Sequence, residues 1–156
     1  MRLHICAVGR LRVGPEKTLI DDYLDRTGKT GRANGLGPVA LREVEDKKGG
    51  GKKAEATLLS NAVPRGAVIV TLDERGKLLS SPEFAAHLAD WRDQGRQDAA
   101  FLIGGADGLD QQLRARADFS LSFGKMVWPH MLARVMLTEQ LYRASAILAG
   151  TPYHRE

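Results

Sequence analysis

Short apolar runs alternate with amphipathic stretches along the whole chain. Five of these runs are bounded by glycine, proline or charged residues, which is the pattern of buried strands. They are Leu3–Val8, Val39–Val44, Ala67–Asp73, Asp98 or Ala99 to Ile103, and Phe119–Phe123. The runs at 67–73 and 99–103 have no polar alternation, as expected for strands covered on both faces.

The stretches between the runs show helical spacing of their apolar residues. Helices are predicted over 16–26, 54–63, Ser81 (as N-cap) to about Gln94, 109–117 and 131–148. Strand and helix therefore alternate, which predicts one α/β domain over 1–156 with a mostly parallel sheet and helices on both faces. Ligands bind beyond the carboxyl ends of such strands, so we expect a site in the loops after Leu72, Ile103 and Phe123.

The last predicted helix carries two stripes. The apolar stripe predicts one buried face: Val135, Leu137, Leu141, Ala144 and Leu148. The other stripe is mostly polar: Arg134, Thr138, Tyr142 and Ser145. Pro129 suits the start of this helix, and Gly150 with Pro152 suits its end.

Three connecting segments are predicted to be irregular. Residues 27–38 are expected to form an exposed loop and residues 74–79 a turn. Residues 45–53 hold three consecutive glycines between lysines. Such a mobile basic loop either closes over a phosphate backbone or merely links strand to helix, and the sequence leaves both readings open.

Length and composition are those of a single globular domain. The chain has 156 residues, 43% of them hydrophobic and 27% charged. No apolar run reaches the ~18 residues of a membrane span, no signal-peptide pattern opens the chain, and the lone Cys6 lies in an apolar run. A cytoplasmic protein is therefore expected. The formal charge of +4 allows a polyanionic partner without requiring one.

Several common catalytic motifs are missing from the sequence. There is no G-x-S-x-G, no H-E-x-x-H and no cysteine cluster, so neither a nucleophile-elbow hydrolase nor a metal site is expected. Gly28-Lys29-Thr30 lacks the earlier glycine of a P-loop. The glycine turn at 104–108 follows a strand, where a nucleotide-binding turn belongs, but it is not G-x-G-x-x-G. Ligand contact and backbone geometry remain alternatives for it.

The end of the chain concentrates groups that suit RNA. His130 opens the last helix, and the chain closes on Tyr153-His154-Arg155-Glu156. Guanidinium planes and aromatic rings hold phosphates and splayed bases. From composition alone, exposed polar residues and a solvated tail are the simpler explanation.

Longer motifs carry a family resemblance over essentially the whole chain. They are L-x-x-x-A-V-G (3–9), V-T-L-D (70–73), L-I-G-G-A-D-G-L (102–109), S-F-G-K-M-V-W-P-H (122–130), P-H-x-x-x-R-V-x-L-x-E-Q-x-Y-R-A (129–144) and the closing P-Y-H-R-E. Together they resemble the RlmH family, SPOUT-superfamily methyltransferases that modify a pseudouridine in large-subunit ribosomal RNA. Residues 27–37 match least.

The resemblance implies a fold and a reaction. The fold would be a Rossmann-like, mostly parallel sheet whose C-terminal segment makes a trefoil knot, which general topology rules would never suggest. The protein would act as a homodimer and transfer a methyl group from S-adenosyl-L-methionine to N3 of a pseudouridine in 23S ribosomal RNA. A methyltransferase acting on transfer RNA, or a non-enzymatic ribosome-binding protein with a degenerate cofactor pocket, are the alternatives.

The resemblance also implies site residues. The cofactor-binding positions are Leu72, Gly104, Gly105, Phe123, Gly124, Lys125, Met126, Val127 and Trp128. The acceptor pocket would be lined by His130, Arg134, Tyr142 and His154. Arg143 and Arg155 would hold RNA phosphate. No metal is required, because the charge on the sulfonium already activates the leaving group.

Overall fold

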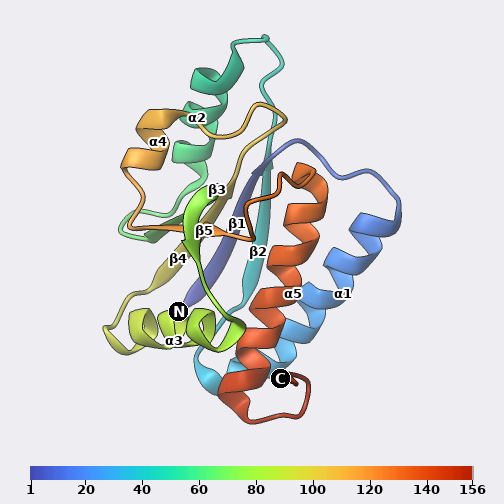
Figure 1. The fold of residues 1–156 in the computed structure, drawn as a ribbon, viewed down its shortest axis with the longest axis vertical. Coiled ribbons are helices and arrows are strands. Elements are labelled where there is room, and N and C mark those ends of the chain that lie inside the picture. The colour runs from blue at the N-terminus through green and yellow to red at the C-terminus, as the bar shows by residue number, and fades with distance from the viewer. Residues whose placement is uncertain (156) are drawn as a thin grey trace.

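A computed structural model describes residues 1–155 as five strands and their connecting helices (Figure 1). The strands are β1 (Arg2–Val8), β2 (Val39–Val44), β3 (Val68–Leu78), β4 (Asp98–Ile103) and β5 (Phe119–Ser122). The helices are α1 (Pro15–Gly31), the 3-10 helix η1 (Arg32–Asn34), α2 (Gly51–Ala62), α3 (Ser81–Asp93), α4 (Gln111–Ala115) and α5 (His130–Ala149). The strand order is β2-β1-β4-β3-β5, and every pairing is parallel. The predicted α/β fold class is confirmed.

Alternation along the central strands builds a core on each face of the sheet. In β1, Leu3, Ile5 and Ala7 join a cluster with α3 and α5. Cys6 and Val8 point the other way, into a cluster with α2 and α4. Figure 1 shows α1 and α5 on one side of the sheet and α2 and α4 on the other. Both clusters are apolar throughout, which is why β1 and β4 have no polar alternation.

The segment predicted as an exposed loop over 27–38 is largely helical and partly buried. Helix α1 runs on to Gly31, and η1 follows it. Thr27 donates its hydroxyl to the Tyr23 carbonyl, and Leu36 is buried in the main core. The expectation was wrong because packing against α5 outweighs the weak helix propensity of glycine and threonine.

Strand β3 is longer than its apolar run. It continues to Leu78, with a register shift against β5 between Leu72 and Lys77, so the turn predicted at 74–79 is replaced by an irregular strand. Gly76 permits this, since a Cβ there would lie 2.7 Å from the Ser120 carbonyl. The helix that follows is capped by Ser80 rather than Ser81, in a capping box with Glu83.

Helix α5 is buried on more than its apolar stripe. Arg134, Thr138 and Ser145 are fully buried, because the helix lies between α1 and α3 as well as against the sheet. The hydroxyls of Thr138 and Ser145 bond to carbonyls of the helix itself, which satisfies them without solvent. The polarity of the second stripe suggested an exposed face, but three of its four residues are buried.

The last helix begins at one end of the strands, and the chain ends at the other. Strands β1, β2 and β4 run toward the upper end in Figure 1, where α5 begins, while the chain ends at the lower end. No helix within residues 1–155 is both long and apolar enough to cross a membrane.

Candidate functional site

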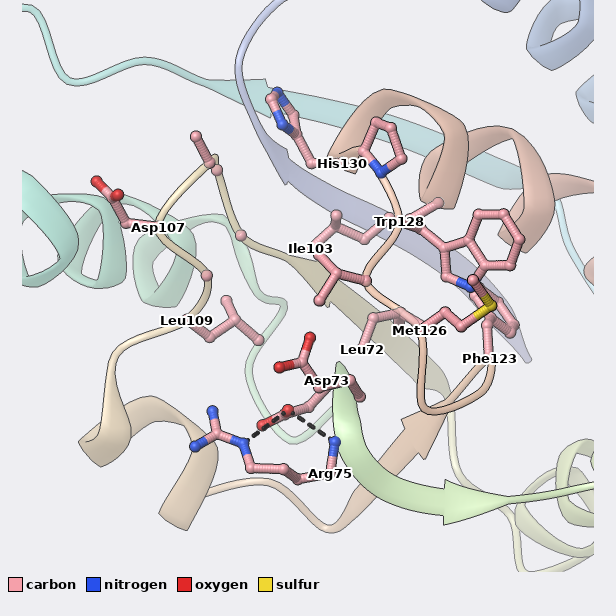
Figure 2. A pocket seen from close by; sticks show the side chains of 18 of the residues that line it. Leu72, Asp73, Arg75, Ile103, Asp107, Leu109, Phe123, Met126, Trp128 and His130 are labelled. Carbon is pink, nitrogen blue, oxygen red and sulfur yellow. Dashed lines mark hydrogen bonds and ion pairs between the residues drawn. The ribbon is translucent and has the colours of Figure 1, made fainter.

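A cavity of about 640 Å³ opens at the carboxyl ends of β3, β4 and β5. Three segments line it (Figure 2): residues 72–75, residues 103–109, and a third segment between Leu121 and Ala133 in which Lys125 does not line the cavity. The loops expected to hold a site, after Leu72, Ile103 and Phe123, thus do meet at one cavity. Its volume falls in the range of pockets for cofactor-sized ligands.

The glycine turn forms one wall of the cavity, and its first two glycines leave little room for a Cβ. A Cβ on Gly104 would lie 2.6 Å from the Gly108 carbonyl carbon, and one on Gly105 would lie 3.2 Å from a Glu55 carboxylate oxygen. Gly105 and Gly108 form an isolated bridge that closes the turn. The glycines are therefore required by backbone geometry, and the same geometry brings main-chain groups to the cavity wall.

The loop from Phe123 to Pro129 forms the opposite wall. Gly124 has φ of +123°, and its N–H donates to the Ser122 hydroxyl at 3.0 Å. Within residues 1–155, the backbone groups of 125–128 make no hydrogen bond. Met126 and Val127 are 74% and 77% exposed. In Figure 2, Phe123, Met126 and Trp128 lie beside one another along this wall.

Asp73 is a fixed negative charge at the cavity. Its carboxylate accepts from the Arg75 N–H (3.0 Å) and Nε (3.2 Å) and contacts Arg114 Nη1 at 3.3 Å, bonds partly visible in Figure 2. Burial raises the pKa of Asp73, but the hydrogen bonds from Arg75 and the charges of both arginines outweigh it and lower the pKa overall. Sequence reasoning missed this residue, although it closes the predicted strand at 67–73.

His130 is the member of the predicted acceptor set that lines the cavity. It starts α5, and its ring lies close to Gly9, at the end of β1. Burial lowers its pKa, and the nearby charge of Arg134 lowers it further. Its imidazole is therefore biased toward the neutral form.

Arg134 is fully buried and does not line the cavity. Its Nη1 donates to the Gly9 carbonyl (3.1 Å) and pairs with Glu43 (2.8 Å), while Nη2 donates to the Val8 carbonyl (3.1 Å). Glu43 also accepts from the N–H of Leu11 at 2.6 Å. The guanidinium thus ties α5 to the end of β1, one turn away from His130.

The other predicted residues lie at the far end of α5. Arg143 bonds to Glu139 and contacts His154 Nδ1 at 3.2 Å, while the Tyr142 and Tyr153 rings are 4.6 Å apart. The tail is folded back on its own helix, and exposed Arg155 follows it. His130 and Tyr142 are twelve residues apart, or about 18 Å along a helix. Within one chain, the predicted acceptor residues therefore form two groups.

Among residues 1–155, no group of three or more His, Cys, Asp or Glu side chains is arranged to hold a metal ion. The cavity offers a ligand main-chain polar groups, an apolar lining, the acidic residues Asp73, Glu74 and Asp107, and Arg75. A parallel α/β sheet with such a cavity at its carboxyl edge is the arrangement of an enzyme that binds a nucleoside-type ligand.

Comparison with known proteins narrows this class to one family. The sequence profile described as predicted SPOUT methyltransferase matches residues 1–154, so the chain belongs to the SPOUT methyltransferases and, within them, to the RlmH family. It is 70% identical over 155 residues to the ribosomal RNA large subunit methyltransferase H of Ruegeria sp. (strain TM1040), and 72% identical to that of Dinoroseobacter shibae. Each alignment covers 99% of both chains.

Two further comparisons agree with this assignment. The protein of the same name from Paracoccus denitrificans is 69% identical over the full length of both chains. The structure of a probable methylase family protein from Haemophilus influenzae Rd KW20 aligns with a TM-score of 0.58 at 12% identity, covering 99% of this chain and 70% of that one. This second likeness concerns the fold alone. The predicted resemblance is confirmed, and the protein is a methyltransferase.

Proposed function

We propose that the protein transfers a methyl group from S-adenosyl-L-methionine to N3 of a pseudouridine in the 23S ribosomal RNA of the large subunit. The observation that carries this proposal is the main-chain-lined cavity at the carboxyl edge of a chain about 70% identical, end to end, to enzymes named for large-subunit RNA methylation. Such a substrate would locate the enzyme in the cytoplasm, with the ribosomes.

The cofactor would bind between the glycine turn and the 123–128 loop. Leu72, Gly104, Gly105 and the residues Phe123 to Trp128 are the proposed contacts. The fit rests on two observations, the tightly packed glycine turn that brings its main chain to the cavity wall and the main-chain groups of 125–128 that make no hydrogen bond within residues 1–155. When bound, the cofactor supplies a methyl group on a positively charged sulfur. The family's trefoil knot would hold these two loops against each other.

His130 is the residue we assign to the N3 proton. It lies at the cavity, and its lowered pKa favours the neutral imidazole, which can accept a proton. Arg134 would act through its neighbours, by holding α5 and the end of β1 in register, rather than by touching the base. Catalysis would otherwise consist of alignment at near-attack distance.

A second subunit would complete the site. Tyr142 and His154, with Arg143 and Arg155 as phosphate contacts, would act from the partner of a homodimer. The support is that these residues lie about 18 Å along α5 from His130, too far to share one pocket. Exposed apolar side chains also cluster beside the cavity, at Met126, Val127, Trp128 and Leu132. Such a patch is typical of a protein interface.

The test is methyl incorporation from labelled S-adenosylmethionine into assembled ribosomes, isolated large subunits and bulk transfer RNA, all from cells that lack the modification. We expect label on a single pseudouridine of the large-subunit RNA. Label on transfer RNA would show that the protein is a methyltransferase with a different RNA substrate. If the protein binds the cofactor but labels none of these RNAs, the proposed substrate is wrong. If it does not bind the cofactor, a non-enzymatic ribosome-binding protein is favoured.

A further inference from the structure

Two loops beside the cavity carry an excess of positive charge. They are residues 9–14, after β1, and residues 45–53, which follow β2 and include the first turn of α2. Together they hold six cationic and two acidic side chains, a balance of +4 that equals the formal charge of the whole chain. The rest of the chain is therefore electrically balanced. We call the six cations the basic edge: Arg10, Arg12, Lys47, Lys48, Lys52 and Lys53.

The cations of the basic edge are largely free of ion pairs, unlike those of α1. On α1, Lys17, Arg26 and Lys29 each pair with an aspartate four residues earlier or later. Within residues 1–155, the four lysines and Arg12 of the basic edge have no ion pair, and all five are exposed. Arg10 reaches Glu45 at 3.6 Å, which links the two loops. Five charges in this small region repel one another unless an anion binds.

Hydrogen bonds define the backbone that carries these charges. The first loop is fixed because Glu43 accepts from the Leu11 N–H and is itself held by Arg134. The second is fixed because Asp46 accepts from the N–H groups of Lys48 and Gly50. The Asp46 carboxylate therefore binds main-chain N–H groups of its own loop. A loop that is already shaped loses less conformational entropy when it binds.

The basic edge adjoins the mouth of the cavity. The first loop begins at Gly9, where a Cβ would lie 3.8 Å from the ring of His130. The second leads into α2, whose Glu55 lies against Gly105 of the glycine turn. Both loops emerge at the same end of the sheet as the cavity (Figure 1). In the order β2-β1-β4-β3-β5, the cavity occupies one half of this edge and the cations the other.

We infer that the basic edge is an RNA-binding surface, which holds the phosphate backbone flanking the nucleotide that enters the cavity. This inference rests on the proposed function and adds the surface by which a small domain would hold a large RNA. Exposed lysines that are free to move suit phosphates of irregular RNA, because they act as point charges rather than as rigid forks. Of the two readings of residues 45–53 left open by the sequence, this selects phosphate binding.

The experiment compares the triple variant Lys47→Gln, Lys48→Gln, Lys52→Gln with a control of equal charge change, Arg65→Gln, Arg96→Gln, Arg116→Gln. The control arginines precede β3, β4 and β5, at the opposite edge of the sheet. The assay is steady-state methylation of large subunits that lack the modification, between ~0.05 and ~0.4 M KCl. Cofactor affinity, measured by calorimetry on each variant, reports whether the cavity is intact.

We expect the lysine variant to raise KM for large subunits while kcat and cofactor affinity stay at wild-type values. If each lysine neutralises one phosphate, the slope of log K against log salt falls by about 2, and binding at ~0.1 M salt weakens by about a hundredfold. The arginine control should stay within about threefold of wild type, since loss of distant charge alone acts weakly through screening.

Other outcomes overturn the inference. Wild-type KM and salt slope in the lysine variant would show that the basic edge does not touch the substrate. An equal increase in KM in both variants would show that the effect comes from the net charge of the protein and not from the basic edge. An effect on whole subunits that disappears on protein-free 23S RNA would assign the contact to a ribosomal protein. A wild-type enzyme that methylates no subunit would contradict the proposed function instead, and is recognised before any variant is compared.

Discussion

The substitution Arg134→Met perturbs the protein core without changing a residue of the cavity. It keeps most of the side-chain volume and removes the guanidinium. The change leaves two main-chain carbonyls and the Glu43 carboxylate without their partner. Breaking a buried ion pair from one side costs about 3–5 kcal/mol. Glu43 is 26% exposed and can turn toward water, so we expect the lower end, about 3 kcal/mol.

Urea unfolding at one fixed protein concentration measures this loss, because an assembly would make stability depend on concentration. A loss of about 3 kcal/mol should also lower the melting temperature by roughly 6–12 °C for a chain of this size. Arg143→Met is the matched control on the same helix, since its pair with Glu139 is partly exposed and should contribute less than about 1 kcal/mol.

A double-mutant cycle with Glu43→Gln separates the ion pair from the carbonyl contacts. We expect a coupling energy of about 1–3 kcal/mol between the two positions. A loss below about 1 kcal/mol in Arg134→Met, or no coupling in the cycle, would refute the argument that this arginine is a structural tie between α5 and β1.

Three further predictions concern single residues. Gly104→Ala should weaken cofactor binding more than tenfold in calorimetry, since its Cβ would lie 2.6 Å from the Gly108 carbonyl carbon, whereas Gly28→Ala, with nothing within 4 Å, should bind normally. The lowered pKa of His130 means that the unfolded chain binds the proton first, so stability should fall as pH drops below about 6.5; kcat should fall with it, and His130→Asn should flatten the stability profile while abolishing methylation. A flat wild-type profile would contradict this. Burial raises the pKa of Cys6 to about 11, so a thiol reagent at neutral pH should label it only after unfolding, and labelling of the folded protein would show that β1 opens.

The elements with simple patterns could be predicted from the sequence. Strands β1, β2 and β4 and helix α5 were placed within a residue or two, because their apolar spacing agrees with their packing. The segment 73–78 has no such alternation, and its strand conformation depends on close contact of Gly76 with β5. Thr27 and Leu36 are buried in a region where α1 and η1 pack against α5, about a hundred residues later in the chain.

The candidate site divides in the same way. The loops at its edge followed from the rule for parallel sheets. The glycine turn, for which the pattern left ligand contact and backbone geometry as alternatives, forms one wall of the cavity. Arg134 could not be placed from helical spacing, since one stripe of α5 faces several neighbours at once. Asp73 was missed because its partner Arg114 comes from another helix, at a separation that no local motif records.

His130 begins α5, whereas His154 lies against Arg143, more than half the helix away. In the proposed homodimer, this separation has a genetic consequence. A chain with a substitution at one end of the helix would still carry intact site residues at the other end. When chains with His130→Ala and chains with His154→Ala pair at random, half the dimers are mixed, and each mixed dimer has one undamaged site. About a quarter of the normal sites are then restored from two inactive alleles, so the two ends of α5 would form separate complementation groups within a single gene.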